Sequence, residues 1–126
     1  MSLRTPLSRV RGLGSAHEGT DHFWKQRVTA LANLVLVIGL LWFVLASLGS
    51  THAEFAARVA NPFVAGMLIL LIVSGVMHMK IGMQVIIEDY VHGEGAKIAA
   101  LIGNIFFAAA VGIVGVLAVL KLALGG

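Results

Sequence analysis

The sequence predicts an all-α membrane protein with three transmembrane helices. Of its 126 residues, 59% are hydrophobic and 12% are charged, whereas about a quarter of the residues of a soluble domain are charged. The hydrophobic residues gather in three long stretches, at 28–48, 62–87 and 98–120. None of these stretches has the repeated polar face of a helix that packs on the surface of a soluble protein. These observations favour a membrane-spanning helical protein.

Each stretch is long enough to cross a membrane, which takes about 20 residues in helical form. The first and third carry no charge, and the second carries Lys80 alone. Pro62 fits the first turn of the second helix, where a missing N–H costs little. We expect residues 49–61 to connect the first two helices, and Gly93 and Gly95 to form the turn between the second and third.

Residues 1–27 form a basic arm that we expect to lie at the membrane interface, ahead of a three-helix anchor domain at 28–126. The arm holds five of the nine Lys and Arg residues: Arg4, Arg9, Arg11, Lys25 and Arg27. The positive-inside rule then predicts a cytoplasmic N-terminus and a periplasmic C-terminus in a bacterial inner membrane, or the equivalent in a mitochondrial inner membrane. The same rule explains the basic arm more simply than nucleic-acid binding does.

His78 is the one histidine, of five, that lies within a predicted span. Three interpretations are open: a buried histidine bonded to a neighbouring helix, a proton relay, or a haem ligand. Gly75 and Gly82 share its helix face and would leave a flat patch for a porphyrin. A relay would need further acids on that face, and none precedes Glu88. A single histidine cannot supply the three or four ligands of a zinc site, so a second axial ligand of a haem would come from a partner.

Glu88, Asp89 and Tyr90 follow at the predicted inner end of the second span. Tyr90 lies about 18 Å along the helix from His78. Tyrosine is common at membrane interfaces, so an anchoring role is one interpretation. The other is a quinone site, in which the Tyr90 hydroxyl donates to a quinone carbonyl and Asp89 orients it or passes protons.

Two cations accompany these residues. Arg27 begins the first span on the inner side and would pair with a lipid phosphate or with a haem propionate. Lys80 can extend its ammonium to the inner surface or reach a propionate. The third span carries a stripe of small residues that is typical of helix packing: Ala100, Asn104, Ala108 and Gly112. We expect another subunit to complete so thin a bundle.

The stretch from His78 to Tyr90 resembles the H-x-x-x-G-x-x-x-x-x-x-D-Y signature of the small hydrophobic membrane anchors of succinate dehydrogenase, respiratory complex II. His78, Gly82, Asp89 and Tyr90 all keep the spacing of that signature. The arm is similar to that of the alphaproteobacterial form of these anchors. Its matching segments are Arg4-Thr-Pro-Leu, Gly12-Leu-Gly-Ser-Ala and Asp21-His-Phe-Trp-Lys-Gln-Arg27-Val-Thr-Ala.

The resemblance implies a subunit of succinate:ubiquinone oxidoreductase in the respiratory chain and the tricarboxylic acid cycle. A flavoprotein, an iron–sulfur subunit and a companion cytochrome b anchor would be its partners, and the two anchors would complete a haem-binding bundle. His78 would be an axial ligand of haem b, and Arg27 would contact its propionates. Tyr90 and Asp89 would bind ubiquinone. Succinate oxidation would occur on other subunits, because this chain has no flavin fingerprint and no cysteine.

Two alternatives keep the same architecture. One is the anchor of a quinol:fumarate reductase, since the sequence of an anchor does not set the direction of the reaction. The other is a small membrane scaffold or transporter without a cofactor. A haem b spectrum that depends on His78 would distinguish the two oxidoreductase anchors from the cofactor-free scaffold or transporter.

Overall fold

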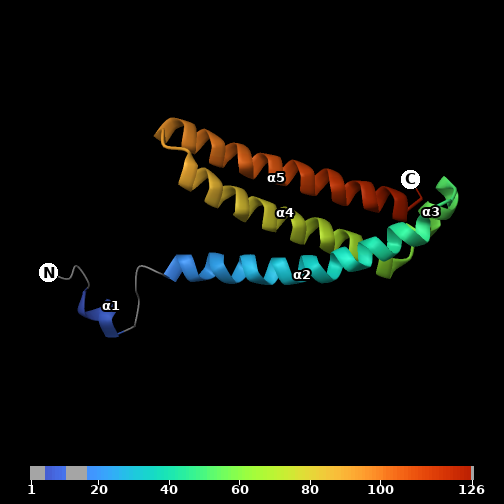
Figure 1. The fold of residues 1–126 in the computed structure, drawn as a ribbon, viewed down its shortest axis with the longest axis horizontal. Coiled ribbons are helices and arrows are strands. Elements are labelled where there is room, and N and C mark those ends of the chain that lie inside the picture. The colour runs from blue at the N-terminus through green and yellow to red at the C-terminus, as the bar shows by residue number, and fades with distance from the viewer. Residues whose placement is uncertain (1–4, 11–16, 126) are drawn as a thin grey trace.

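The computed structural model describes residues 5–10 and 17–125, which form helices and connecting turns (Figure 1). No strand occurs in these two ranges, so the predicted all-α class is confirmed. In chain order the helices are α1 (Pro6–Val10), α2 (His17–Ser47), α3 (His52–Val59), α4 (Pro62–Tyr90) and α5 (Glu94–Ala123).

Three of these helices are long and apolar enough to cross a membrane, as the sequence predicts. The helices extend beyond the predicted spans, because α2 begins at His17 and α4 ends at Tyr90. Residues 17–27 of the predicted arm are therefore helical and continuous with the first span. The division of the chain at residue 27 stays a prediction, and Arg4 and Arg11 lie outside the described residues.

The helix α4 packs against both α2 and α5. Over much of its length it lies between them, and α2 crosses it near α3 (Figure 1). We call these three long helices the helical layer. Close approach on both sides of α4 depends on glycine. A Cβ at Gly39 would meet the Met67 sulfur at 2.6 Å, and one at Gly115 would meet Ile72 at 3.1 Å. The predicted small-residue stripe of α5 packs towards α4: Asn104 and Ala108 are buried, and Gly112 faces Val76.

One end of the layer, which we call the α3 end, holds a helix that the sequence did not predict. Residues 49–61 are not merely a connection, since α3 occupies most of them. Thr51 and Glu54 form a capping box that satisfies two backbone N–H groups at the start of α3. The helix then buries Val59 against Phe43 of α2 and Val119 of α5. The α3 end therefore has a small hydrophobic core built from three helices of this chain.

The opposite end, the Tyr90 end, contains the start of α2 and the short turn between α4 and α5 (Figure 1). Gly93 precedes α5 as its N-cap, as a turn residue should, but Gly95 lies inside α5 and its prediction as a turn residue is wrong. Pro62 occupies the first turn of α4 behind an Asn61 cap, which confirms its predicted place. Asp89 and Tyr90 close α4 at this end and are exposed.

Candidate functional site

His78 lies on α4 and is half-buried against α2. Its Nδ1 atom is 3.3 Å from the Oγ1 hydroxyl of Thr29, a residue of α2 that is 8% exposed. One turn before His78, the Ser74 hydroxyl donates to the Thr29 backbone carbonyl at 3.3 Å. Two polar contacts between α2 and α4 therefore meet at Thr29 and fix where the imidazole lies.

Thr29 belongs to a polar seam on α2 that the sequence alone did not single out. Its members are Gln26, Thr29 and Asn33, spaced three and four residues apart and therefore on one face of the helix. That face meets α4, because Thr29 contacts His78 and the Gln26 amide lies 3.6 Å from a Cβ built at Gly82. The spacing was readable from the sequence, since three polar residues on one face of an apolar helix are unusual.

The two glycines expected beside His78 have different surroundings. A Cβ added at Gly75 would meet no atom within 4 Å, so the surface of α4 is open there. Gly82 is instead covered by Gln26 from α2. Within this chain, the side-chain-free patch next to His78 is therefore at Gly75, and Gly82 allows α2 and α4 to approach.

The polar cluster at the end of α4 is fully accessible from outside the chain. Glu88 accepts a hydrogen bond from the Gln84 amide at 2.9 Å. Tyr90 is 76% exposed and Asp89 is also exposed. Eleven residues separate Asp89 from His78, which places both on nearly the same face of α4, while Tyr90 is turned about 120° from His78. The structure brings Asp89 and Tyr90 to one helix end but makes no bond between them.

Arg27 lies on a different side of α2 from the seam. Its guanidinium stacks over Phe23, 5.0 Å from the ring centroid, and its side chain is exposed. Two residues along a helix rotate a side chain by about 200°, so Arg27 points away from Thr29 and His78. Lys80 instead lines a cleft of about 150 Å³ between α2 and α4, together with His22 and Lys25. Lys25 is paired there with Asp21 at 2.8 Å.

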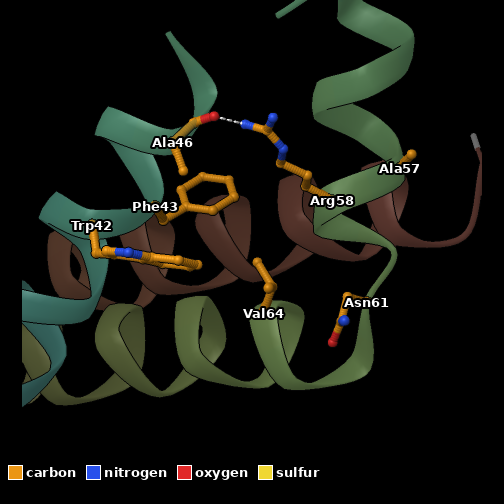
Figure 2. Close-up of a pocket in the computed structure, with 7 residues that line it drawn as sticks. All are labelled: Trp42, Phe43, Ala46, Ala57, Arg58, Asn61 and Val64. Carbon is orange, nitrogen blue, oxygen red and sulfur yellow. Dashed lines mark hydrogen bonds between the residues drawn. The ribbon is translucent and has the colours of Figure 1, made fainter.

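A larger pocket of about 490 Å³ opens at the α3 end, between Trp42, Asn61 and Val64 (Figure 2). Arg58 reaches across it and donates to the Ala46 carbonyl near the end of α2. A cation that bonds the last carbonyls of a helix stabilises that terminus. We assign this pocket a structural role, because its charged group is already used within the fold.

The described ranges hold no cluster of three or more His, Asp or Glu side chains arranged to bind a metal ion. Within these ranges His78 belongs to no such cluster, and its Nδ1 atom contacts Thr29.

Known proteins resemble this chain over most of its length. A family described as the succinate dehydrogenase/fumarate reductase transmembrane subunit matches residues 1–117. A succinate dehydrogenase hydrophobic membrane anchor subunit from Paracoccus denitrificans is 36% identical over 121 residues, which are 96% of this chain and 93% of that protein. A protein of the same name from Rickettsia bellii is 31% identical over 88 residues, 70% of each chain. No solved structure gives a significant match.

The family match covers all of α2, α3 and α4 and most of α5. The Paracoccus relative extends the likeness over nearly the whole chain. The description of the family as a transmembrane subunit agrees with the three apolar helices of the structure. The chain belongs to the succinate dehydrogenase/fumarate reductase transmembrane subunit family.

Proposed function

We propose that this chain anchors a succinate:ubiquinone oxidoreductase in the membrane, supplies one axial ligand of haem b through His78, and forms part of the quinone site through Tyr90 and Asp89. The observation that carries the proposal is the pairing on α4 of a half-buried imidazole with an exposed tyrosine at the helix end. The named relatives support the anchoring role.

The residues around His78 fit a haem. One ring nitrogen contacts Thr29, and the described residues make no hydrogen bond to the other. Gly75 leaves the neighbouring surface of α4 free of side-chain atoms. When bound, a haem supplies a one-electron carrier. The work of this chain is to hold an imidazole at a set position and to keep the surrounding helix surface apolar.

A second axial ligand and most of the haem envelope would come from a companion cytochrome b anchor. The layered arrangement supports this, because α2 and α4 leave large apolar faces uncovered. Arg27 remains our candidate for a propionate contact. It points away from the seam, and its guanidinium contacts Phe23 but pairs with no carboxylate of the described residues, so its donors can meet a carboxylate outside this chain.

The quinone is a substrate, and its reduction takes two electrons and two protons. Electrons would arrive from the iron–sulfur subunit, which receives them from the flavoprotein that oxidises succinate. Tyr90 would donate a hydrogen bond to one carbonyl of the quinone, and Asp89 would lie beside the path by which protons enter. The exposure of both side chains leaves them free to meet a ligand held between subunits.

The proposal places the Tyr90 end on the cytoplasmic side, with a cytoplasmic N-terminus and a periplasmic C-terminus. The cations Lys25 and Arg27 at the start of α2 support this orientation. A flavoprotein and an iron–sulfur subunit would dock there, next to Tyr90. Because the family description also names fumarate reductase, the anchor of a quinol:fumarate reductase is the second candidate function.

The experiment that tests this function is a Tyr90→Phe substitution in the purified complex. Loss of one hydrogen bond to the quinone in the transition state predicts a decrease of about tenfold in succinate:ubiquinone activity. Succinate oxidation with an artificial dye, which bypasses the quinone, should be unchanged. Trp42→Phe is the matched control, since it removes an exposed aromatic N–H at the α3 end.

Wild-type rates of ubiquinone reduction in Tyr90→Phe would contradict the quinone role. Equal loss of ubiquinone and dye activities would contradict it as well, because the defect would then lie in assembly. Failure of this chain to co-purify with any flavoprotein would overturn the anchoring function itself.

A further inference from the structure

The hydroxyl of Thr29 has its single hydrogen committed within α2. Thr29 Oγ1 lies 2.8 Å from the Lys25 carbonyl and 3.1 Å from the Gln26 carbonyl, and carbonyls only accept hydrogen bonds. Such bonds to the carbonyl one turn earlier are a common habit of threonine in helices. With its proton directed there, the Thr29 oxygen can serve His78 only as an acceptor.

With Thr29 as the acceptor of the contact at 3.3 Å, we infer that the hydrogen is on Nδ1 of His78. In a neutral imidazole, a proton on Nδ1 leaves the lone pair on Nε2. Nε2 makes no hydrogen bond to the described residues, so its lone pair is free to bind a metal. The tautomer of His78 is thus set by α2, from a residue 49 positions earlier in the chain.

The position of the hydroxyl is itself held. Thr29 is buried, and the Ser74 hydroxyl donates to its backbone carbonyl from α4. An acceptor that cannot move fixes the plane of the ring it holds as well as its tautomer. Partners of this kind orient metal-bound histidines and raise their basicity, and their loss typically costs 10- to 100-fold in metal affinity.

We propose that Thr29 is the positioning residue of the haem site: its hydroxyl accepts from Nδ1–H of His78 and directs Nε2 to the iron. This inference rests on the proposed role of His78 and adds to it the ligating nitrogen and the residue that selects it. The signature around His78 does not indicate which ring nitrogen would bind the iron, because the contact that selects it joins α2 to α4.

The test is Thr29→Val in the purified complex, which keeps the shape of the side chain and removes the acceptor. A less basic imidazole favours ferric iron less. We expect the ferric-to-ferrous binding ratio to fall about tenfold, which raises the haem midpoint potential by about 59 mV for a one-electron couple. The largest g value of the ferric haem in electron paramagnetic resonance should also shift, because it depends on the orientation of the axial imidazole.

Two further variants separate the hydroxyl from the fold. Thr29→Ser keeps the acceptor and should retain the wild-type potential and g value. Ser74→Ala removes the neighbouring bond between α2 and α4 but keeps the Thr29 hydroxyl that accepts from the imidazole, so its shift in potential and g value should be smaller than that of Thr29→Val.

An unchanged potential and g value in Thr29→Val would overturn the proposal, as would an equal shift in Thr29→Ser. Thr29→Ala repeats the test with a side chain that cannot clash. If neither the Val nor the Ala variant assembles, the proposal is also wrong, since a residue that only positions His78 should be dispensable for folding. Failure of the proposed function is distinguishable: haem would then survive His78→Ala, whatever the Thr29 variants show.

Discussion

The two ends of the helical layer are stabilised in different ways. At the α3 end, Phe43, Val59 and Val119 are buried together, and Phe55 packs on Phe43 with ring centroids 5.4 Å apart. Towards the Tyr90 end, the hydrogen bonds to Thr29 join α2 and α4, Ile81 and Ile87 are buried, and the last residues of α4 are exposed. One end has a core of three hydrophobic residues from three helices, whereas the other exposes the candidate quinone-site side chains.

This difference separates the residues that stabilise the helices from those that are available to partners and ligands. The α3 end joins the helices through a hydrophobic core of its own. Ionisable and polar groups can then be kept at the Tyr90 end for partners and ligands, although such groups are costly in a membrane. Substitutions at the α3 end should therefore change stability, and those at the Tyr90 end should change redox chemistry.

The largest effect on stability is expected for Phe43→Ala. Removing a buried ring leaves a cavity and costs about 3 kcal/mol. The thermal dissociation midpoint of the purified complex should fall, while the haem spectrum of the remaining intact complex stays unchanged. Phe63→Ala is the matched control, because Phe63 is 86% exposed at the same end. Equal losses in the two variants would show that the α3 end has no core of its own.

A smaller effect is expected for Thr51→Ala. The substitution removes the side chain that caps α3 and should cost about 1 kcal/mol. Hydrogen exchange of the α3 amides should then become about fivefold faster, with no change in α4 or α5. Ser50→Ala, next to the cap, is the control. Faster exchange throughout the chain would mean that α3 is not a local unit.

The smallest effect is expected for Asn104→Ala, which removes the bond of 2.9 Å from the Asn104 amide to the Lys80 carbonyl. Hydrogen bonds between membrane helices contribute about 0.6 kcal/mol on average. Asn33→Ala is the matched control, because the Asn33 Oδ1 atom is buried without a partner in the described residues. A larger fall in the dissociation midpoint for Asn33 than for Asn104 would show that a partner chain satisfies Asn33.

The sequence predicted the three spans, the place of Pro62 and the packing stripe of α5, because length, hydropathy and small residues are local properties. It did not predict α3, whose eight residues are too few to show a helical period, although Thr51 and Glu54 carry a capping-box signal. Gly95 was assigned to a turn because a glycine near a helix start can lie on either side of the cap.

The sequence indicated only part of the candidate site: His78 and Tyr90, but not Thr29. His78 and Tyr90 stand out because few residue types can ligate iron or donate a proton in an apolar helix. Thr29 does not stand out, since its role depends on which face of α2 meets α4, and an apolar helix gives little indication of that. The polar spacing of Gln26, Thr29 and Asn33 was the available signal, and it becomes meaningful once the helices are packed.

The most direct test of the account is the reduced-minus-oxidised spectrum of the purified complex carrying His78→Ala, with His92→Ala as the matched control. His92 is an exposed histidine in the turn after α4. We expect the haem b bands to disappear in His78→Ala and to persist in His92→Ala. Wild-type bands in a complex that lacks the His78 imidazole would contradict this expectation.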